Sequence, residues 1–384
     1  MIVVFYTATC YLDISLEIIK VLKQIVSLHV LIEIHPGSKN LNIVQIEDLP
    51  VGRTLVAPKD LMNQEQYQSI EPYLSGAASV HFVVHPGGGI MSFIKASFDL
   101  FKFIRNLNPD ILHLEALLFR SSGLLPVLPY CNRLVIVVHD SVAHVGEKDW
   151  KIDLLKFIYV HFPKTKRFLF YSKFSKKQFE SLYGETAQSA VLKMGNYTYF
   201  SKVKYTQPRE PGYLLFFGRL SKYKGLEVLI NAMNEVWTEF PEQTLIIAGK
   251  SVKGFELNHD LVSREDRIIF IDEYISNDSL ASLIRGSQLV ICPYIEATQS
   301  GVLMTAFGLG VPVIASRVGA FPEFVRDNVN GILVNAGDAS ELATTLKSCL
   351  RDQSYLVMRS NIININNSSL WDDNRQILMN VYTA

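Results

Sequence analysis

A short loop in the second half of the chain combines glycines with two fixed positive charges. The sequence GRLSKYKG (residues 218–225) follows an apolar run and precedes a helical pattern. Glycine lets the backbone approach a ligand closely, and the start of a helix offers unpaired N–H groups. Arg219 can hold two phosphate oxygens at once and Lys224 acts as a point charge, so the pair suits a diphosphate. The spacing differs from the phosphate-binding pattern GxxxxGK[ST], and a plain strand-to-helix turn with solvated lysines is the alternative.

A second loop, PYIEATQSGV (residues 293–302), also follows an apolar run. Thr298 to Gly301 can open a helix that ends near Gly308 and aim its N–H groups at an anion. Glu296 places an isolated carboxylate beside this turn. It is a candidate for contact with a substrate, and the alternative is an acidic residue that merely favours the helix dipole.

Two other segments are weaker candidates for a functional site. Pro322-Glu323 suits the first turn of a helix, and a structural role for Glu323 is favoured over a catalytic one. The run Gly87-Gly88-Gly89 has no clear strand-to-helix context, so it is weak support for a nucleotide site.

Apolar runs of strand length recur along the whole chain, with helix-length stretches between them. They are nearly continuous rather than alternating, which is typical of parallel strands covered by helices on both faces. Residues 225–239 show helical spacing, and Asp338 with Glu341 predicts a capped helix start. The expected fold class is therefore α/β and doubly wound. The predicted strands are 2–8, 30–35, 111–116, 134–139, 167–172, 190–195, 213–218, 244–249, 268–273, 289–294, 312–316 and 331–335.

A polar segment with two prolines, residues 199–212, predicts a linker in the middle of the chain. We expect two Rossmann-like domains of similar size, over residues 1–200 and 201–365. Residues 366–384 follow, with a helical pattern near their end. Two such domains place a ligand cleft between them, at the carboxyl ends of the strands.

The composition narrows the class of protein further. Of 384 residues, 48% are hydrophobic and 19% charged, which excludes a disordered chain. Lysine plus arginine and aspartate plus glutamate number 37 each, and this zero net charge argues against binding bulk nucleic acid. The four cysteines form no CxxC pair, which favours a reduced compartment without structural zinc. No uncharged apolar stretch is long enough for a membrane span, so we expect a cytoplasmic protein.

The second half resembles the donor-nucleotide domain of family 4 glycosyltransferases, which have the GT-B fold of two Rossmann-like domains facing each other across a cleft. The first half resembles the family's acceptor side more loosely, and the closing segment SSLWDDNRQILMNVY resembles its C-terminal helix, which crosses back onto the first domain. The similar stretches are FFGRLSKYKGLEVLINAM (216–233), LIIAGK (245–250), DEYISNDSLASLIRGSQLVICPY (272–294), EATQSGV (296–302) and GVPVIASRVGAFPEFVRDNVNGILV (310–334), with NPDILHLEA (108–116), VVHDSVAH (137–144), YSKFSKKQF (171–179) and LKMGNY (192–197) in the first half.

This resemblance implies a retaining transfer of a sugar from a nucleotide diphosphate donor, without a metal ion or other cofactor. Because the leaving diphosphate gains charge, cations and N–H donors of the protein must stabilise it. Arg219 and Lys224 match the family's diphosphate pair. His139 matches a histidine that approaches the donor sugar, and a capped strand-end histidine is the alternative. The positions that match donor-binding loops are Gly218, Tyr274, Ile275, Gln299, Ser300, Gly301, Val302 and Thr305.

The sequence departs from the family at one motif. Many members carry two glutamates in an E-x7-E arrangement, of which the second holds the ribose hydroxyls. Aligned through GVPV (310–313), the second falls on Thr305 and the first on Ala297, one residue beyond Glu296. A branch with ATQSG at this place also lacks the second glutamate. Glu296 therefore remains the candidate for the sugar-facing carboxylate and Thr305 the candidate for the ribose.

Residues 148–177 interleave basic and aromatic side chains. Such a surface helix fits the cytoplasmic face of an anionic bilayer, and a solvated helix with its apolar side in the core is the alternative. We predict peripheral attachment, because acceptors of this family are often lipid-linked. The residues are Lys148, Lys151, Lys156, Lys164, Lys166, Arg167, Lys173, Lys176 and Lys177, with Trp150, Leu154, Leu155, Phe157, Ile158 and Phe162 among them.

The main hypothesis is a cytoplasmic, metal-independent, hexosyltransferase-type glycosyltransferase of bacterial surface polysaccharide synthesis. Its partners would be a nucleotide sugar and a glycan or lipid-linked acceptor, with no nucleic acid. A non-catalytic partner or scaffold subunit is the alternative, motivated by the missing second glutamate and opposed by the diphosphate pair. An NAD-dependent oxidoreductase is disfavoured, because no GxGxxG follows the first strand.

Overall fold

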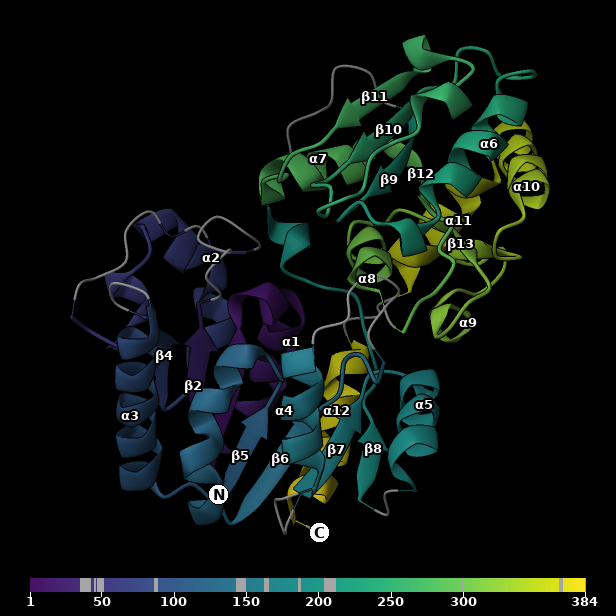
Figure 1. The fold of residues 1–384 in the computed structure, drawn as a ribbon. Coiled ribbons are helices and arrows are strands. Elements are labelled where there is room, and N and C mark those ends of the chain that lie inside the picture. The colour runs from purple at the N-terminus through teal and green to yellow at the C-terminus, as the bar shows by residue number, and fades with distance from the viewer. Residues whose placement is uncertain are drawn as a thin grey trace.

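The computed structural model describes residues 1–34, 43–44, 46, 52–85, 89–142, 150–161, 166–185, 188–203, 212–298, 300–365 and 369–383. Two sheets of parallel strands, each flanked by helices, form two domains that lie one above the other in Figure 1. The α/β fold class expected from the apolar runs is confirmed.

The N-terminal domain is built on an eight-stranded sheet in the order β3-β4-β2-β1-β5-β6-β7-β8. Its described strand pairs are parallel, except that β3 runs antiparallel to β4. The strands are β1 Ile2–Ala8, β2 Ser27–Glu33, β3 Leu55–Val56, β4 Ser79–Val83, β5 Ile111–Leu114, β6 Arg133–Val137, β7 Lys166–Phe170 and β8 Ser189–Val191. The helices are α1 Leu12–Leu22, α2 Gln64–Leu74, α3 Gly89–Leu107, α4 Trp150–His161 and α5 Lys173–Tyr183, with 3-10 helices η1 Thr9–Tyr11, η2 Pro58–Asp60, η3 Phe119–Tyr130 and η4 Phe200–Lys202.

This sheet is buried on both faces because alternate residues of a strand enter different cores. In β1, Val3 and Phe5 join the core under α1 and α2, whereas Val4 and Tyr6 join the core under α3, η3 and α4. Burial on both faces requires apolar side chains at successive positions. The continuous apolar runs predicted the strands correctly for this reason.

The C-terminal domain is built on a six-stranded parallel sheet in the order β11-β10-β9-β12-β13-β14. The strands are β9 Tyr213–Phe217, β10 Leu245–Ala248, β11 Ile268–Ile271, β12 Ser287–Cys292, β13 Val313–Ser316 and β14 Gly331–Val334. The helices are α6 Leu226–Val236, α7 Asn277–Gly286, α8 Gly301–Gly308, α9 Phe321–Phe324, α10 Ala339–Asp352 and α11 Ser354–Asn364, with 3-10 helices η5 Lys222–Lys224, η6 His259–Leu261 and η7 Glu265–Arg267.

The predicted capping box of α10 forms only in part. The Asp338 side chain accepts a hydrogen bond from the Glu341 N–H at 2.8 Å, as expected. The Glu341 carboxylate instead accepts from the Asn335 N–H at 2.8 Å. It thereby ties the end of β14 to the first turn of the helix.

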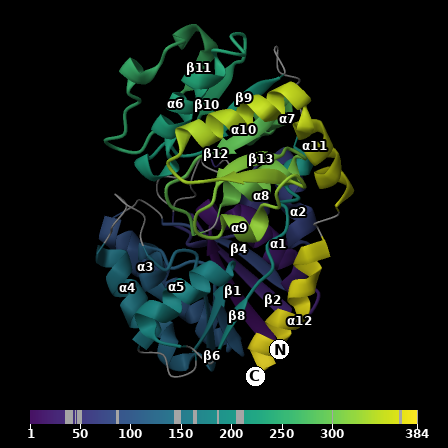
Figure 2. The ribbon, with the colours of Figure 1, turned by 90° about the vertical axis from the view of Figure 1, so that its right-hand side faces the viewer.

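The last helix, α12 (Ser369–Thr383), returns to the N-terminal domain, and Figure 2 shows α10, α11 and α12 descending one after another from the upper domain to the lower. The Trp371 indole N–H donates to the Asn196 carbonyl at 2.9 Å. The Asn374 side chain forms two hydrogen bonds with the Lys193 backbone, of 2.8 and 2.9 Å. The chain therefore crosses between the domains twice, after β8 and before α12.

The sequence patterns missed β3 and β4. β3 spans two residues, and β4 includes Ser79 and His81, so neither forms a clear apolar run. The view that Gly87-Gly88-Gly89 lacks a strand-to-helix context is wrong, because β4 ends at Val83 and α3 begins at Gly89. Gly87 and Gly88 themselves lie outside the described residues.

Candidate active site

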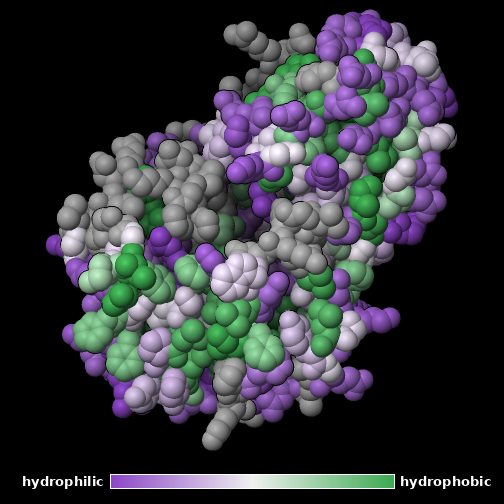
Figure 3. Space-filling model, in the orientation of Figure 1, coloured by the Kyte–Doolittle hydropathy of each residue, from purple (hydrophilic) through white to green (hydrophobic). Residues whose placement is uncertain are grey.

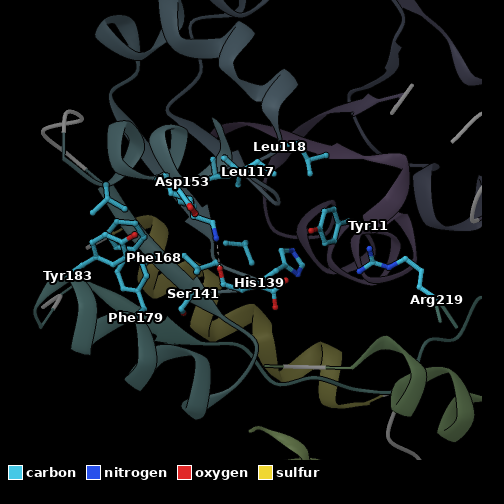
Figure 4. Close-up of a pocket in the computed structure, with 17 residues that line it drawn as sticks. Tyr11, Leu117, Leu118, His139, Ser141, Asp153, Phe168, Phe179, Tyr183 and Arg219 are labelled. Carbon is cyan, nitrogen blue, oxygen red and sulfur yellow. Dashed lines mark hydrogen bonds between the residues drawn. The ribbon is translucent and has the colours of Figure 1, made fainter. Parts of the chain in front are cut away.

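A cavity of about 240 Å³ lies where the carboxyl ends of the N-terminal strands meet the loop after β9. Most of its wall belongs to the N-terminal domain, and Arg219 reaches it from the C-terminal domain (Figure 4). Parallel sheets bind ligands at this edge, outside the carboxyl ends of their strands. The lining residues that the site uses are Tyr11, His139, Asp140, Ser141, Lys156 and Arg219.

Arg219 is exposed and follows the end of β9. Figure 4 shows its guanidinium directed toward Tyr11 and His139 of the opposite domain. The side chain therefore brings a permanent positive charge into the gap between the domains, where a guanidinium can hold an anionic ligand with two hydrogen bonds.

Lys224 belongs to the same loop but does not line the cavity, and it is 5% exposed. Its Nζ is 5.3 Å from the centre of the Tyr294 ring. A Cβ added at Gly218 would come within 2.8 Å of this Nζ and within 3.4 Å of Val302 at the start of α8. The ammonium group thus lies against the Gly218 backbone, between the loop after β9 and α8. Low solvent exposure strengthens the field of such a charge.

The two loops singled out in the sequence are packed against each other. Gly225 has φ +68°, and a Cβ there would lie 2.0 Å from the Pro293 carbonyl oxygen. The Ile295 N–H donates to the Tyr223 carbonyl at 2.7 Å. Only glycine suits position 225, since it tolerates both this φ and the close backbone approach.

Helix α8 begins at the interface between the domains. Ser300 has extended backbone angles and precedes Gly301, the first helical residue. A Cβ added at Gly301 would lie 3.7 Å from Asp13 Oδ2, so the start of α8 faces the start of α1. The first N–H groups of a helix attract anions. The predicted Gln299 lies outside the described residues.

Glu296 and Thr305 are placed less favourably for their predicted roles. Glu296 is exposed in the loop after β12 and does not line the cavity. Thr305 is 4% exposed, and its hydroxyl donates to the Gly301 carbonyl at 2.8 Å. The hydroxyl hydrogen of Thr305 is therefore engaged within α8.

Two of the positions matched to donor-binding loops, Tyr274 and Ile275, lie near the edge strand β11 of the C-terminal sheet. Tyr274 and Ile275 follow β11 and precede α7. Tyr274 is exposed, and neither residue lines the cavity. They are at the carboxyl end of a parallel strand, as a ligand-binding loop of this fold class must be.

His139 lies at the base of the cleft and is buried. Its Nε2 is 2.7 Å from the Glu115 carbonyl oxygen and 3.2 Å from Glu115 Oε1. Burial by itself lowers the pKa of His139, but the hydrogen bond and negative charge of Glu115, aided by Asp140, raise it above its usual value. His139 therefore keeps its second proton to a higher pH than a free imidazole does.

Two contacts next to His139 join the domains. The Thr298 hydroxyl donates to the Asp140 carboxylate, and the Ser172 hydroxyl donates to the Thr298 carbonyl at 3.3 Å. Lys156 of α4 donates to the Asp140 carbonyl at 2.8 Å. Asp140 is thus held from both sides, by its own domain and by the loop before α8.

Glu323 forms a third contact between the domains. Its carboxylate accepts hydrogen bonds from the Lys173 and Phe174 N–H groups at 2.9 and 2.8 Å. A carboxylate at the start of a helix satisfies unpaired donors and favours the dipole. The structural role predicted for Glu323 is correct, but it serves α5 of the other domain.

Sequence reasoning missed two acidic residues near His139, Asp13 and Glu115, neither of which lines the cavity. Both follow strands of the N-terminal sheet, Asp13 at the start of α1 and Glu115 directly after β5. Burial raises the pKa of Asp13 to about 6, although the Ile14 N–H and the charge of His139 oppose the rise. The signal available in the sequence was a carboxylate at the end of an apolar run.

The remaining findings concern metals and membranes. Among the described residues, no group of three or more histidine, cysteine, aspartate or glutamate side chains is placed to hold a metal ion. Within the same part of the chain, none of the helices has the length and apolar character needed to cross a bilayer.

Comparison with known proteins finds a family match for most of the second domain. Residues 211–352 match the family described as Glycosyl transferases group 1. The D-inositol 3-phosphate glycosyltransferase of Corynebacterium kroppenstedtii is 28% identical over 178 residues, which cover 44% of this chain and 40% of the relative. The phosphatidyl-myo-inositol mannosyltransferase of Mycobacterium leprae is 32% identical over 147 residues, 38% of this chain and 39% of the relative. The chain thus spans about two fifths of the length of the curated relatives it matches.

Solved structures match the whole chain. The Anabaena protein HepE in complex with UDP covers 100% of both chains with a TM-score of 0.66 and 16% identity. A UDP-GlcNAc 2-epimerase of Neisseria meningitidis bound to UDP-GlcNAc covers 99% of both chains with a TM-score of 0.56 and 13% identity. The fold is GT-B, as the resemblance implied, and the family match is confined to residues 211–352 of the C-terminal domain. Because the fold also includes an epimerase, the fold by itself does not define the reaction.

Proposed function

We propose that this protein is a retaining, metal-independent, hexosyltransferase-type glycosyltransferase that uses a nucleotide diphosphate sugar. The observation that carries the proposal is Arg219, which extends from the glycosyltransferase group 1 domain into the gap toward His139. A departing diphosphate there would meet the guanidinium, the enclosed ammonium of Lys224 and the start of α8. Preorganised positive charge of this kind stabilises a leaving group whose negative charge grows.

The N-terminal wall fits the transferred sugar and the acceptor. His139 in its charged form offers a hydrogen-bond donor, and Asp13 and Asp140 offer acceptors for sugar hydroxyls. HepE has been solved with UDP and glucose, and the mycobacterial and corynebacterial relatives are named for glycosyl transfer. These similarities support a sugar nucleotide as donor and a glycan or lipid-linked acceptor. A role in bacterial surface polysaccharide synthesis, in the cytoplasm, is part of the proposal.

A non-catalytic partner subunit is the second candidate, favoured by Thr305 in place of a ribose-binding glutamate. Such a subunit would bind a nucleotide sugar without consuming it. The test is a panel of nucleotide sugars screened by thermal shift, followed by product analysis for each binder with and without EDTA. We expect one donor to raise the melting temperature and to be turned over in EDTA, with the donor's anomeric configuration kept in the product. Binding without turnover or donor hydrolysis would favour the partner subunit, and an inverted product or loss of activity in EDTA would refute the mechanism proposed.

We also propose peripheral contact with an anionic membrane through the N-terminal domain. Exposed apolar side chains gather over α3, η3 and α4, in the lower part of Figure 3. Cations lie over three of these rings, namely Lys102 over Phe98, Arg105 over Tyr130 and Lys151 over Phe119. Apolar side chains flanked by lysine and arginine suit an anionic interface. The exposed apolar residues are Ile90, Met91, Ile94, Phe98, Phe119, Tyr130, Trp150, Leu154 and Phe157.

This surface is larger than the sequence indicated and differs from it in composition. α3 contributes four of the apolar side chains, although the prediction rested on residues 148–177. Arg167, one of the predicted basic residues, is 5% exposed and donates to the Val381 carbonyl, so it does not belong to the surface. Lys148, Phe162 and Lys164 lie outside the described residues.

Sedimentation with vesicles of phosphatidylglycerol and phosphatidylcholine tests the membrane contact. We expect binding at low salt that weakens as salt rises, and that is strongly reduced in Met91→Glu and Trp150→Glu. Leu356→Glu on α11 is the matched control, since Leu356 is an exposed apolar residue of the other domain. Equal sedimentation of all variants would refute this surface.

A further inference from the structure

Glu115 lies directly behind His139 at the base of the cleft. It follows β5, its side chain is fully buried, and both its carboxylate and its carbonyl oxygen approach His139 Nε2. We propose that Glu115 is a positioning residue for His139, and that the C-terminal helix α12 supports this carboxylate through Tyr382 and His113. The catalytic consequence rests on the proposed function, whereas the contacts do not depend on it.

The two contacts decide which nitrogen of His139 carries a proton. Nε2 faces two acceptors, the Glu115 carbonyl at 2.7 Å and Oε1 at 3.2 Å, so it must carry the hydrogen. Nδ1 is therefore the nitrogen on the other side of the ring. The Tyr11 ring lies 4.3 Å from the imidazole, centre to centre, and fixes its plane. This arrangement sets both the tautomer and the orientation of the histidine.

A tyrosine that directly follows β7, two strands away in the sheet, holds the same carboxylate. The Tyr171 hydroxyl donates to Glu115 Oε1 at 2.6 Å. Burial and the nearby carboxylate raise the pKa of Tyr171 well above its usual value, so its hydroxyl keeps the proton and acts as a donor. Oε1 is thus fixed by Tyr171 and His139 together.

The second oxygen of Glu115 faces a histidine that α12 orients. Oε2 lies 3.9 Å from His113 Nε2, and neither atom has a hydrogen-bond partner among the described residues. His113 Nδ1 is 2.5 Å from the Tyr382 hydroxyl. Burial lowers the pKa of His113 to about 3 and raises that of Tyr382, so the imidazole is neutral and the phenol is the donor. The hydrogen of His113 then resides on Nε2, on the side of the carboxylate.

Two arginines hold the end of α12 in the position from which Tyr382 contacts His113. Arg133 and Arg167, at the starts of β6 and β7, donate to the carbonyl oxygens of Tyr382 and Val381. The Glu115 carboxylate is held by Tyr171 and His139 on one side, and His113 faces it at 3.9 Å on the other. A buried carboxylate fixed in this way also fixes the group it binds. The support of the cleft therefore includes a segment more than 200 residues away in sequence.

The titration of His139 tests this arrangement without any need for activity. In protein with 13C,15N-labelled histidine, the His139 signals are identified by their loss in His139→Gln. The groups that act on this titration are Glu115, Asp140, Asp13, Tyr11 and Tyr171. We expect Glu115→Gln to lower the midpoint by about 1–2 pH units, because the negative charge beside the imidazole is gone.

Tyr382→Phe tests the role of α12 and has a matched control. Without the phenol, His113 can move its hydrogen to Nδ1 and turn a lone pair toward Glu115, so we expect the His139 midpoint to shift, by less than in Glu115→Gln. Tyr159→Phe also removes a buried hydroxyl, one that donates to the Ser121 carbonyl at 2.8 Å, and should leave the titration unchanged. Comparing Tyr382→Phe with Tyr159→Phe tests the proposal even if Glu115→Gln does not fold.

Kinetics supply a second readout that a merely structural role would not move. We expect Glu115→Gln to lower kcat by roughly tenfold or more, with little change in KM for the donor. An unchanged His139 titration in Glu115→Gln, or equal shifts in Tyr382→Phe and Tyr159→Phe, would overturn the proposal. A shifted titration in a protein without transferase activity would uphold the positioning contact and refute the proposed function.

Discussion

The two walls of the cleft carry side chains of opposite charge. The C-terminal wall presents cations, with Arg219 exposed and Lys224 enclosed beside Gly218. The N-terminal wall presents acids, Asp13 and Glu115, around the histidine His139. Under the proposed function, a nucleotide diphosphate would be attracted to the first wall, and a neutral sugar or acceptor hydroxyl would find its hydrogen-bond partners on the second.

The two walls also differ in the contacts that fix their side chains: those of one wall are local in sequence, and those of the other are long-range. The cations belong to one loop, whose glycines pack against the neighbouring loop of the same domain. His139 depends on side chains from β5, β7 and α12, far apart in sequence. Local motifs thus suffice to build the cationic wall, and the acidic wall requires the assembled sheet.

The largest effect is expected from the cationic wall. Arg219→Ala should lower kcat/KM for the donor by about 10²–10³, the usual cost of one preorganised donor at a developing negative charge. Arg317→Ala, which removes an exposed arginine 3.7 Å from Asp327, is the control and should keep wild-type activity. Steady-state kinetics with purified variants measures both. Activity of Arg219→Ala close to that of wild type would mean that the cleft does not use this charge.

The close packing of the two C-terminal loops predicts a large loss of stability. Gly225→Ala combines a strained φ with a clash against the Pro293 carbonyl, and should lower the free energy of unfolding by about 2–4 kcal/mol. Gly337→Ala has a similar φ of +77° with open space around it, so it should cost only about 1 kcal/mol. Urea unfolding of both variants separates the clash from the strain. Equal losses would show that the loops adjust to each other.

The acidic wall predicts a dependence of stability on pH. The pKa of Asp13 is raised to about 6 from 3.8, so the folded state binds more protons than the unfolded state between these values. The contribution of Asp13 to stability is therefore present at low pH and is lost as the pH rises through 6. Relative to Asp13→Asn, the wild type should lose roughly 1–3 kcal/mol between pH 4 and pH 7. Urea unfolding of both proteins across this range measures the difference, and parallel curves would contradict a raised pKa of Asp13.

The smallest effect concerns a contact that joins the walls. Glu323→Ala should cost roughly 0.5–2 kcal/mol, since it removes the cap of α5 supplied by the other domain. Faster hydrogen exchange at the Lys173 and Phe174 amides would locate the effect. Asp338→Ala removes a cap within the C-terminal domain and should leave these two amides unchanged. Similar exchange in Glu323→Ala and wild type would show that this contact does not hold the domains together.

The sequence predicted the fold more completely than the site. Apolar runs indicated twelve of the strands, because parallel strands buried on both faces need continuous apolar residues. They missed β3 and β4, where the runs are short or interrupted. Arg219 and Lys224 were found because a glycine-bounded loop keeps its chemistry within eight residues. Asp13 and Glu115 were not, since a single acid after a strand has no pattern of its own.

Order along the chain thus determined the alternation of strands and helices, the two domains and the loops with glycines and cations, because each of these depends on near neighbours in sequence. The tertiary structure decided which side chains meet. It engaged the Thr305 hydroxyl within α8, left Glu296 outside the cavity, turned Arg167 inward to α12 and brought Tyr382 behind His113. The physical reason is that hydrogen bonds and buried charges require contact within a few ångströms, and for residues hundreds of positions apart only the packed sheets and helices provide it.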